Sequence, residues 1–153
     1  MSNKKTCRSN SPQQTEAVAE KIGHNLKGGE TIELISDIGG GKTTFVRGLA
    51  KGFGSTNHVS SPTFTISKVY KNGPKEIHHF DFYRLPEAGL IAHELQEVVN
   101  DPDCTVVVEW AEKVNHALPA ERLTVTFVTK FETDRELVLS WPGSLAYLTK
   151  DIK

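Results

Sequence analysis

The chain has 153 residues, which suits one domain with a substantial hydrophobic core. Hydrophobic residues make up 37% of it and charged residues 24%, and the formal net charge of −1 provides no general electrostatic attraction for nucleic acid. No apolar run approaches the roughly 18 residues that a membrane-spanning helix needs. Cys7 and Cys104 have neither metal-ligand spacing nor a disulfide framework, so a reducing, cytoplasmic location is expected.

The sequence organisation predicts one folded domain, over residues 11–141, between two tails. Segment 1–10 is polar and lacks an apolar stretch, so we expect a flexible N-terminal tail. Segment 142–153 is weakly patterned and is expected to form a C-terminal tail. No internal repeat, low-complexity tract or linker divides the residues between them.

The first helix is expected to begin at the Ser-Pro-Gln-Gln stretch of residues 11–14. Its serine can cap the helix, its proline suits the first helical position, and its last glutamine completes a capping box. The two glycines at 28–29 are expected to end this helix. The short apolar run at 32–35 is typical of a buried strand, and apolar residues at helical spacing over 45–53 predict a second helix.

The second half of the chain is richer in strand patterns. Segments 64–70 and 76–83 flank a turn sequence and predict an antiparallel hairpin. A third helix is expected after Pro86, and the β-branched run 105–108 predicts another buried strand. After a short helix or turn at 111–117, two alternating strands are expected at 123–127 and 137–141. These elements together predict an α/β domain with a mixed parallel and antiparallel sheet flanked by helices.

Residues 36–45 read Ser-Asp-Ile-Gly-Gly-Gly-Lys-Thr-Thr-Phe and lie between the first predicted strand and the second predicted helix. Strand, glycine-rich loop and helix form the context of a phosphate-binding loop. The glycines let the backbone turn its N–H groups towards phosphate oxygens, and the helix N-terminus adds the positive end of its dipole. Lys42 can reach the outer phosphates, and the Thr43 hydroxyl can bind Mg²⁺. The motif therefore predicts a P-loop NTPase-like domain.

The loop departs from the usual pattern at its first position, which is Ser36 rather than glycine. Serine adopts positive φ only at some energetic cost, so Ser36 either carries that strain or sits at ordinary φ and caps the turn. The simpler alternative for the whole stretch is a glycine-rich turn with a surface lysine.

Two predicted strands end in carboxylates of the kind that hold the magnesium ion of a nucleotide. Glu109 follows an apolar run, at the edge where parallel strands present their carboxyl ends, and Asp81 ends the hairpin. Glu109 can orient the ion or position the attacking water, and Asp81 can take the remaining role. In the alternative, either acid caps its strand or pairs with Arg84 or Lys113.

Several other polar residues remain open to more than one interpretation. The hydroxyl of Thr63 can sense the terminal phosphate through the metal, or belong to a surface turn. Arg84 can bind phosphate or remain solvated, and Trp110 can stack on a base or fill the core. His78 and His79 are adjacent in a strand and so face opposite sides, which argues against a shared metal. None of the six histidines has ligand spacing, so all are expected to be non-ligands.

Taken together, four stretches resemble the bacterial YjeE/TsaE family, the ATPases of tRNA threonylcarbamoyladenosine synthesis. They are the loop at 36–45, Ser-Pro-Thr-Phe at 61–64, His-Phe-Asp-Phe-Tyr-Arg-Leu at 79–85 and Val-Glu-Trp-Ala at 108–111. Their order and spacing match over roughly residues 12–140. The family usually reads Gly-Asp-Leu-Gly-Ala-Gly-Lys-Thr at the loop, and this chain differs from it at Ser36, Ile38 and Gly40.

The resemblance implies a role for individual positions. Glu109 and Thr43 would bind Mg²⁺, while Thr63 and Asp81 are similar to the switch threonine and second acid of the family. Trp110 is similar to the tryptophan that is important for activity, and Arg135 falls where the family has an arginine near the nucleotide. The expected catalytic residues are Lys42, Glu109, Asp81 and Thr63. The ATP-binding residues are expected to be Ile38, Gly39, Gly40, Gly41, Lys42, Thr43, Thr44, Trp110 and Arg135.

The function implied by the resemblance is slow, Mg²⁺-dependent ATP hydrolysis that assists the TsaB and TsaD proteins. Of these two partners, TsaD transfers the threonylcarbamoyl group to adenosine 37 of certain tRNAs, so tRNA would meet this chain indirectly. The alternatives are a nucleotide-gated binding module with incidental hydrolysis and a small-molecule kinase. The kinase would need a lid with several arginines, and the sequence has no such cluster.

Overall fold

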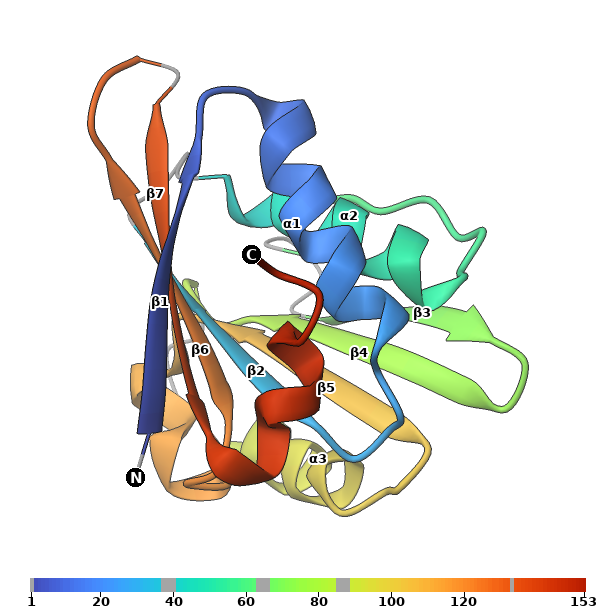
Figure 1. Cartoon of the computed structure of the whole chain (residues 1–153). Helices are drawn as coiled ribbons and strands as arrows, with labels where there is room; N and C mark the ends of the chain where they lie inside the picture. Colours follow the sequence, from blue (N-terminus) through green and yellow to red (C-terminus); the bar gives the residue numbers. More distant parts are fainter. Residues whose placement is uncertain (1, 37–40, 63–66, 85–88, 133) are drawn as a thin grey trace.

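A computed structural model describes residues 2–36, 41–62, 67–84, 89–132 and 134–153. It forms a seven-stranded sheet in the order β1-β7-β6-β2-β5-β4-β3, with β1 at one edge and β3 at the other (Figure 1). The strands are β1 Ser2–Ser9, β2 Thr31–Ile35, β3 Ser67–Asn72, β4 Lys75–Asp81, β5 Cys104–Glu109, β6 Leu123–Thr129 and β7 Arg135–Pro142. The helices are α1 Pro12–His24, α2 Lys42–Phe53, α3 Gly89–Val99 and the 3₁₀ helices η1 Ala111–Ala117 and η2 Gly143–Thr149.

The four central strands of the sheet, β6, β2, β5 and β4, run parallel. The outer pairs β1–β7, β7–β6 and β4–β3 are antiparallel, which confirms the mixed α/β sheet that the sequence predicts. Because the central strands are parallel, their carboxyl ends meet at one edge. The chain leaves the sheet at this edge after β2, β4 and β5, so Ser36 and both candidate acids lie there.

Helices cover both faces of the sheet and enclose two hydrophobic clusters. On one face, α1, α2 and η2 bury Ile32, Leu34 and Val107 among other core residues (Figure 1). On the other face, α3 and η1 pack over Val106 and Val108. Strand β5 is therefore buried on both sides, which is why it reads as a continuous β-branched run.

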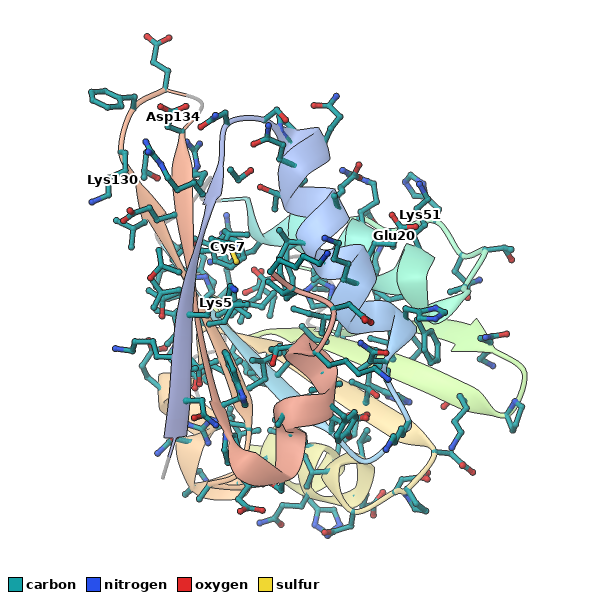
Figure 2. The ribbon with its side chains drawn as sticks, viewed as in Figure 1. Lys5, Cys7, Glu20, Lys51, Lys130 and Asp134 are labelled. Carbon is teal, nitrogen blue, oxygen red and sulfur yellow. The ribbon has the colours of Figure 1, made fainter. Side chains whose placement is uncertain are left out.

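Glycines allow α1 and α2 to pack against each other at very short range. A Cβ atom added at Gly48 would lie 2.3 Å from the carbonyl oxygen of Glu16, and one at Gly52 would lie 2.0 Å from that of Glu20. At the rim of the same contact, Lys51 and Glu20 form an ion pair at 3.9 Å (Figure 2). The close approach sets the position of α2, and thus of the loop end from which α2 starts.

Replacing Gly48 by alanine is expected to lower the free energy of unfolding by about 1–3 kcal/mol, because the added methyl group collides with helix backbone. Urea unfolding followed by circular dichroism measures the change. Gly143→Ala is the matched control, since a Cβ at Gly143 meets no atom within 4 Å. Equal urea midpoints for the two variants would show that α1 and α2 accommodate the added methyl group with no loss of stability.

Both ends of the chain differ from the tails that the sequence predicts. Residues Ser2–Ser9 form β1, which pairs with β7 along its whole length and turns Cys7 towards the core (Figure 2). At the other end, η2 buries Leu145 and Leu148 against the α1–α2 face. Pairing of an edge strand depends mainly on backbone hydrogen bonds, so a polar sequence can form it without an apolar pattern.

Most of the predicted elements are confirmed within the described residues. Ser11 caps α1 and accepts a hydrogen bond from the Gln14 amide at 3.2 Å, although the helix ends at His24, before the predicted glycines. The hairpin and the strands after Pro102 form where predicted, while Pro86 and residues 64–66 lie outside the described part. No helix among the described residues is long and apolar enough to cross a membrane.

Candidate active site

The described end of the glycine loop leads directly into α2. Gly41 has φ of 102°, a left-handed conformation that favours glycine, and α2 begins at Lys42. Thr43 and Thr44, both half-buried, complete the first turn, where backbone N–H groups have no partner within the helix. Such a turn attracts anions. The predicted binding residues Ile38, Gly39 and Gly40 lie outside the described residues.

Lys42 is buried, with 8% of its surface exposed, and its ammonium group lies at the carboxyl edge of the sheet. Its Nζ atom is 3.7 Å from Oε1 of Glu109 and donates a hydrogen bond to the Ser36 carbonyl at 3.3 Å. The same atom lies over the Trp110 ring, 4.6 Å from its centroid. Because Lys42 is buried, the simpler alternative of a glycine-rich turn with a surface lysine is excluded.

The two candidate acids lie side by side at the same edge. Asp81 ends β4 and Glu109 ends β5, and they are direct neighbours across the two parallel strands. They are 4% and 3% exposed, so both acids are buried at this edge. Asp81 accepts a hydrogen bond from the Tyr83 amide at 2.9 Å. The convergence expected from the sequence is thus observed, while the roles of the two acids remain predictions.

Trp110 contacts Lys42, whereas Arg135 lines a separate pocket beside Gly41 and Thr44. Trp110 has φ of 57°, the only positive value among the described non-glycine residues, and its ring lies 4.9 Å from that of Tyr83. Arg135 begins β7, after the turn that Lys130 and Asp134 mark in Figure 2. Its guanidinium donates to the carbonyls of Phe131 and Glu132 at 3.2 and 3.1 Å.

A pocket of about 250 Å³ connects Arg135 to the start of α2. Gly41 and Thr44 form one wall, Arg135 and Glu132 another, and the first turn of α1 closes the third side. Arg135 is far from the loop in sequence, and the pairing of β7 with β6 brings it there. The pocket therefore lies directly beside the first turn of α2.

Comparison with known proteins agrees with this geometry. The family model described as "Threonylcarbamoyl adenosine biosynthesis protein TsaE" matches residues 9–137. The chain belongs to the TsaE family. The TsaE proteins named for tRNA threonylcarbamoyladenosine biosynthesis include relatives from Bacillus subtilis and Treponema pallidum. The first is 35% identical over 87% of this chain and 83% of its own, and the second is 33% identical over 88% and 98%.

The fold of this TsaE family member also matches a solved structure. The crystal structure of YdiB from Bacillus subtilis is similar with a TM-score of 0.77 and 31% sequence identity, covering 94% of this chain and 89% of that one. The chain therefore has the P-loop NTPase-like α/β fold that its glycine loop predicts.

Sequence reasoning missed one residue at the centre of this TsaE site. His79 is completely buried, and its Nε2 atom lies 2.5 Å from Oε2 of Glu109. Because an ionised carboxylate only accepts hydrogen bonds, Nε2 is the donor. The sequence indicates that His78 and His79 face opposite sides, which is confirmed. Only the pairing of β4 with β5 reveals that His79 reaches the acid at 109.

His78 belongs to a different cluster, with Glu76 and Cys104, whose donor atoms lie within 4.8 Å of one another. The Glu76 carboxylate already contacts His78 at 2.9 Å and Lys71 at 3.7 Å. Burial, together with the Asp101 carboxylate, raises the pKa of the Cys104 thiol to about 12, so it stays protonated. These contacts describe an ion-pair network away from the TsaE site. Thr63, the predicted switch residue, lies outside the described residues.

Proposed function

We propose that this TsaE family member is a Mg²⁺-dependent ATPase that assists threonylcarbamoyladenosine modification at position 37 of tRNA in the cytoplasm. The observation that carries this proposal is the contact between Lys42 and Glu109. Lys42 lies at the start of α2, and Glu109 ends β5, the parallel neighbour of β2. A buried cation beside a buried carboxylate at a helix N-terminus suits a polyanion that arrives with its own metal ion.

The donor set fits this ligand. Lys42 would bind the outer phosphates of the nucleotide. These phosphates would replace Glu109 as the ion-pair partner of Lys42. Glu109 would then be available, with the Thr43 hydroxyl, as a hard oxygen ligand of the kind that Mg²⁺ prefers. The bound ion would neutralise charge that develops on the transferred phosphate. Asp81 and Thr63 are assigned supporting roles in orienting water and responding to the terminal phosphate.

The pocket between Arg135 and the start of α2 supports nucleotide binding. Its volume of about 250 Å³ and its contact with Gly41 and Thr44 suit the base or sugar of a nucleotide whose phosphates lie at the turn. We assign this space to ATP because the sequence resemblance implies an ATPase, and the aromatic ring of Trp110 would border the phosphate side. Gly39, Gly40 and Ile38 are assigned to the phosphates through their backbone N–H groups.

TsaB and TsaD are the proposed partners, with tRNA held mainly by them, since the net charge of −1 gives this chain no general affinity for RNA. We expect the purified protein to hydrolyse ATP slowly and addition of TsaB and TsaD to raise the rate, because a partner can complete the site. The test measures phosphate release with and without both partners. An unchanged rate would contradict the proposed partnership, and a rate equal to that of Lys42→Ala under all conditions would contradict the ATPase activity.

A further inference from the structure

A chain of buried polar contacts runs from Glu109 to the segment 57–62, which follows α2. His79 Nε2 donates to Glu109, and His79 Nδ1 lies 3.3 Å from the hydroxyl of Tyr70. That hydroxyl also donates to the backbone carbonyl of Ser60 at 3.2 Å. Tyr70 and His79 are 1% and 0% exposed, so water does not compete for these bonds.

The segment 57–62 is seated on the strand that carries Tyr70. The Lys71 amide donates to the Asn57 side chain at 2.7 Å, and the Lys68 ammonium group contacts the Ser60 hydroxyl. Val59 is 5% exposed and belongs to the main core. Two residues of β3 that flank Tyr70 in sequence, Lys68 and Lys71, thus hold the segment that contains Ser60.

The Tyr70 hydroxyl has a single proton and two neighbours that can accept it, the Ser60 carbonyl and His79 Nδ1. Burial raises the pKa of Tyr70, so the proton stays on the hydroxyl at neutral pH. A shift of Ser60 away from β3 would therefore redirect this proton to the imidazole. The imidazole in turn holds Oε2 of Glu109 and leaves Oε1 directed towards Lys42.

We infer that Tyr70 and His79 are positioning residues that connect the segment 57–62 to Glu109. They hold the carboxylate in one orientation, with Oε2 occupied, so that Oε1 faces the phosphate side of the site. This inference rests on the proposed ATPase function for its kinetic consequence, although the contact chain itself does not depend on nucleotide.

Tyr70→Phe removes the hydroxyl and keeps the buried ring. We expect kcat for ATP to fall about fivefold with KM within about twofold, because one hydrogen bond that orients a catalytic group is lost. Tyr147→Phe is the matched control, since its partly buried hydroxyl donates to the Glu30 carboxylate at 2.7 Å, away from the site. If both variants retain wild-type kcat, or both lose the same fraction, Tyr70 has no positioning role.

Two substitutions at His79 separate its two contacts. Glutamine keeps a donor near the position of Nε2, whereas asparagine keeps a polar group near Nδ1, so His79→Gln should retain more kcat than His79→Asn. Because glutamine breaks the contact with Tyr70, adding Tyr70→Phe to His79→Gln should cause no further loss. The inference would be overturned if the kcat losses of Tyr70→Phe and His79→Gln multiplied in the double variant. A higher kcat for His79→Asn than for His79→Gln would also overturn it.

A measurement without nucleotide distinguishes failure of this inference from failure of the proposed function. The Lys71 amide, which donates to Asn57, reports on the seating of the segment. Its hydrogen exchange should be about fivefold faster in Tyr70→Phe and unchanged in Tyr147→Phe. Unchanged exchange in both would contradict the connection. Faster exchange with no ATPase activity above Lys42→Ala would instead remove the proposed function and leave the contact chain intact.

Discussion

Replacing Glu109 by glutamine is expected to lower ATP turnover about 100-fold or more while ATP affinity changes little. The Glu109 side chain is almost completely buried between Lys42 and His79, so its charge acts in a poorly solvated site. Glutamine has nearly the same shape and can still accept from His79, but it is a weak metal ligand and cannot take a proton from water. Single-turnover phosphate release and equilibrium binding of ATP measure the two effects separately.

Glu33→Gln is the control for this substitution. Glu33 lies on the adjacent strand β2 and forms an ion pair with Arg122 at 3.0 Å, so its replacement also removes a partly buried charge pair. Turnover should stay near the wild-type rate in that variant. If Glu109→Gln supports repeated rounds of tRNA modification with TsaB and TsaD, hydrolysis is incidental and the protein acts as a nucleotide-gated binding module.

Replacing Lys42 by alanine is expected to weaken ATP binding by about 10- to 100-fold and to reduce turnover to the background rate. The ammonium group is the buried cation at the start of α2, and its removal takes away the charge-assisted hydrogen bonds to phosphate. It also leaves Glu109 without its counter-charge, which would repel the incoming phosphates. Calorimetric titration with ATP and Mg²⁺ measures the loss of affinity.

Lys51→Ala tests whether the effect belongs to the site or to the helix. Lys51 lies near the other end of α2, with 73% of its side chain exposed, and pairs with Glu20 on α1. An exposed pair of this kind contributes little to stability, so ATP binding and turnover should match the wild type. Equal losses of ATP affinity for Lys42→Ala and Lys51→Ala would show that Lys42 acts through helix stability and does not contact phosphate.

The sequence is sufficient for those parts of the site that are local. An apolar run, glycines, a lysine and a helical pattern specify the turn that begins α2 at Lys42, because each piece depends on nearby residues. The run before Glu109 likewise predicts a buried strand that ends in an acid, and the hairpin follows from its turn chemistry. Parallel strands then bring Asp81 and Glu109 to one edge as a consequence of topology.

Other features depend on contacts between residues distant in the chain, which no local pattern encodes. The register of β4 against β5 decides that His79, not His78, reaches Glu109, and β3 adds Tyr70 to that contact. Strand β1 forms from a polar segment because the edge of β7 offers unpaired backbone groups. Sequence alone determined the start of α2 and the acids that end β4 and β5, since these features rest on local sequence patterns. The tertiary structure decided what surrounds Glu109, since strand register is set by the whole sheet.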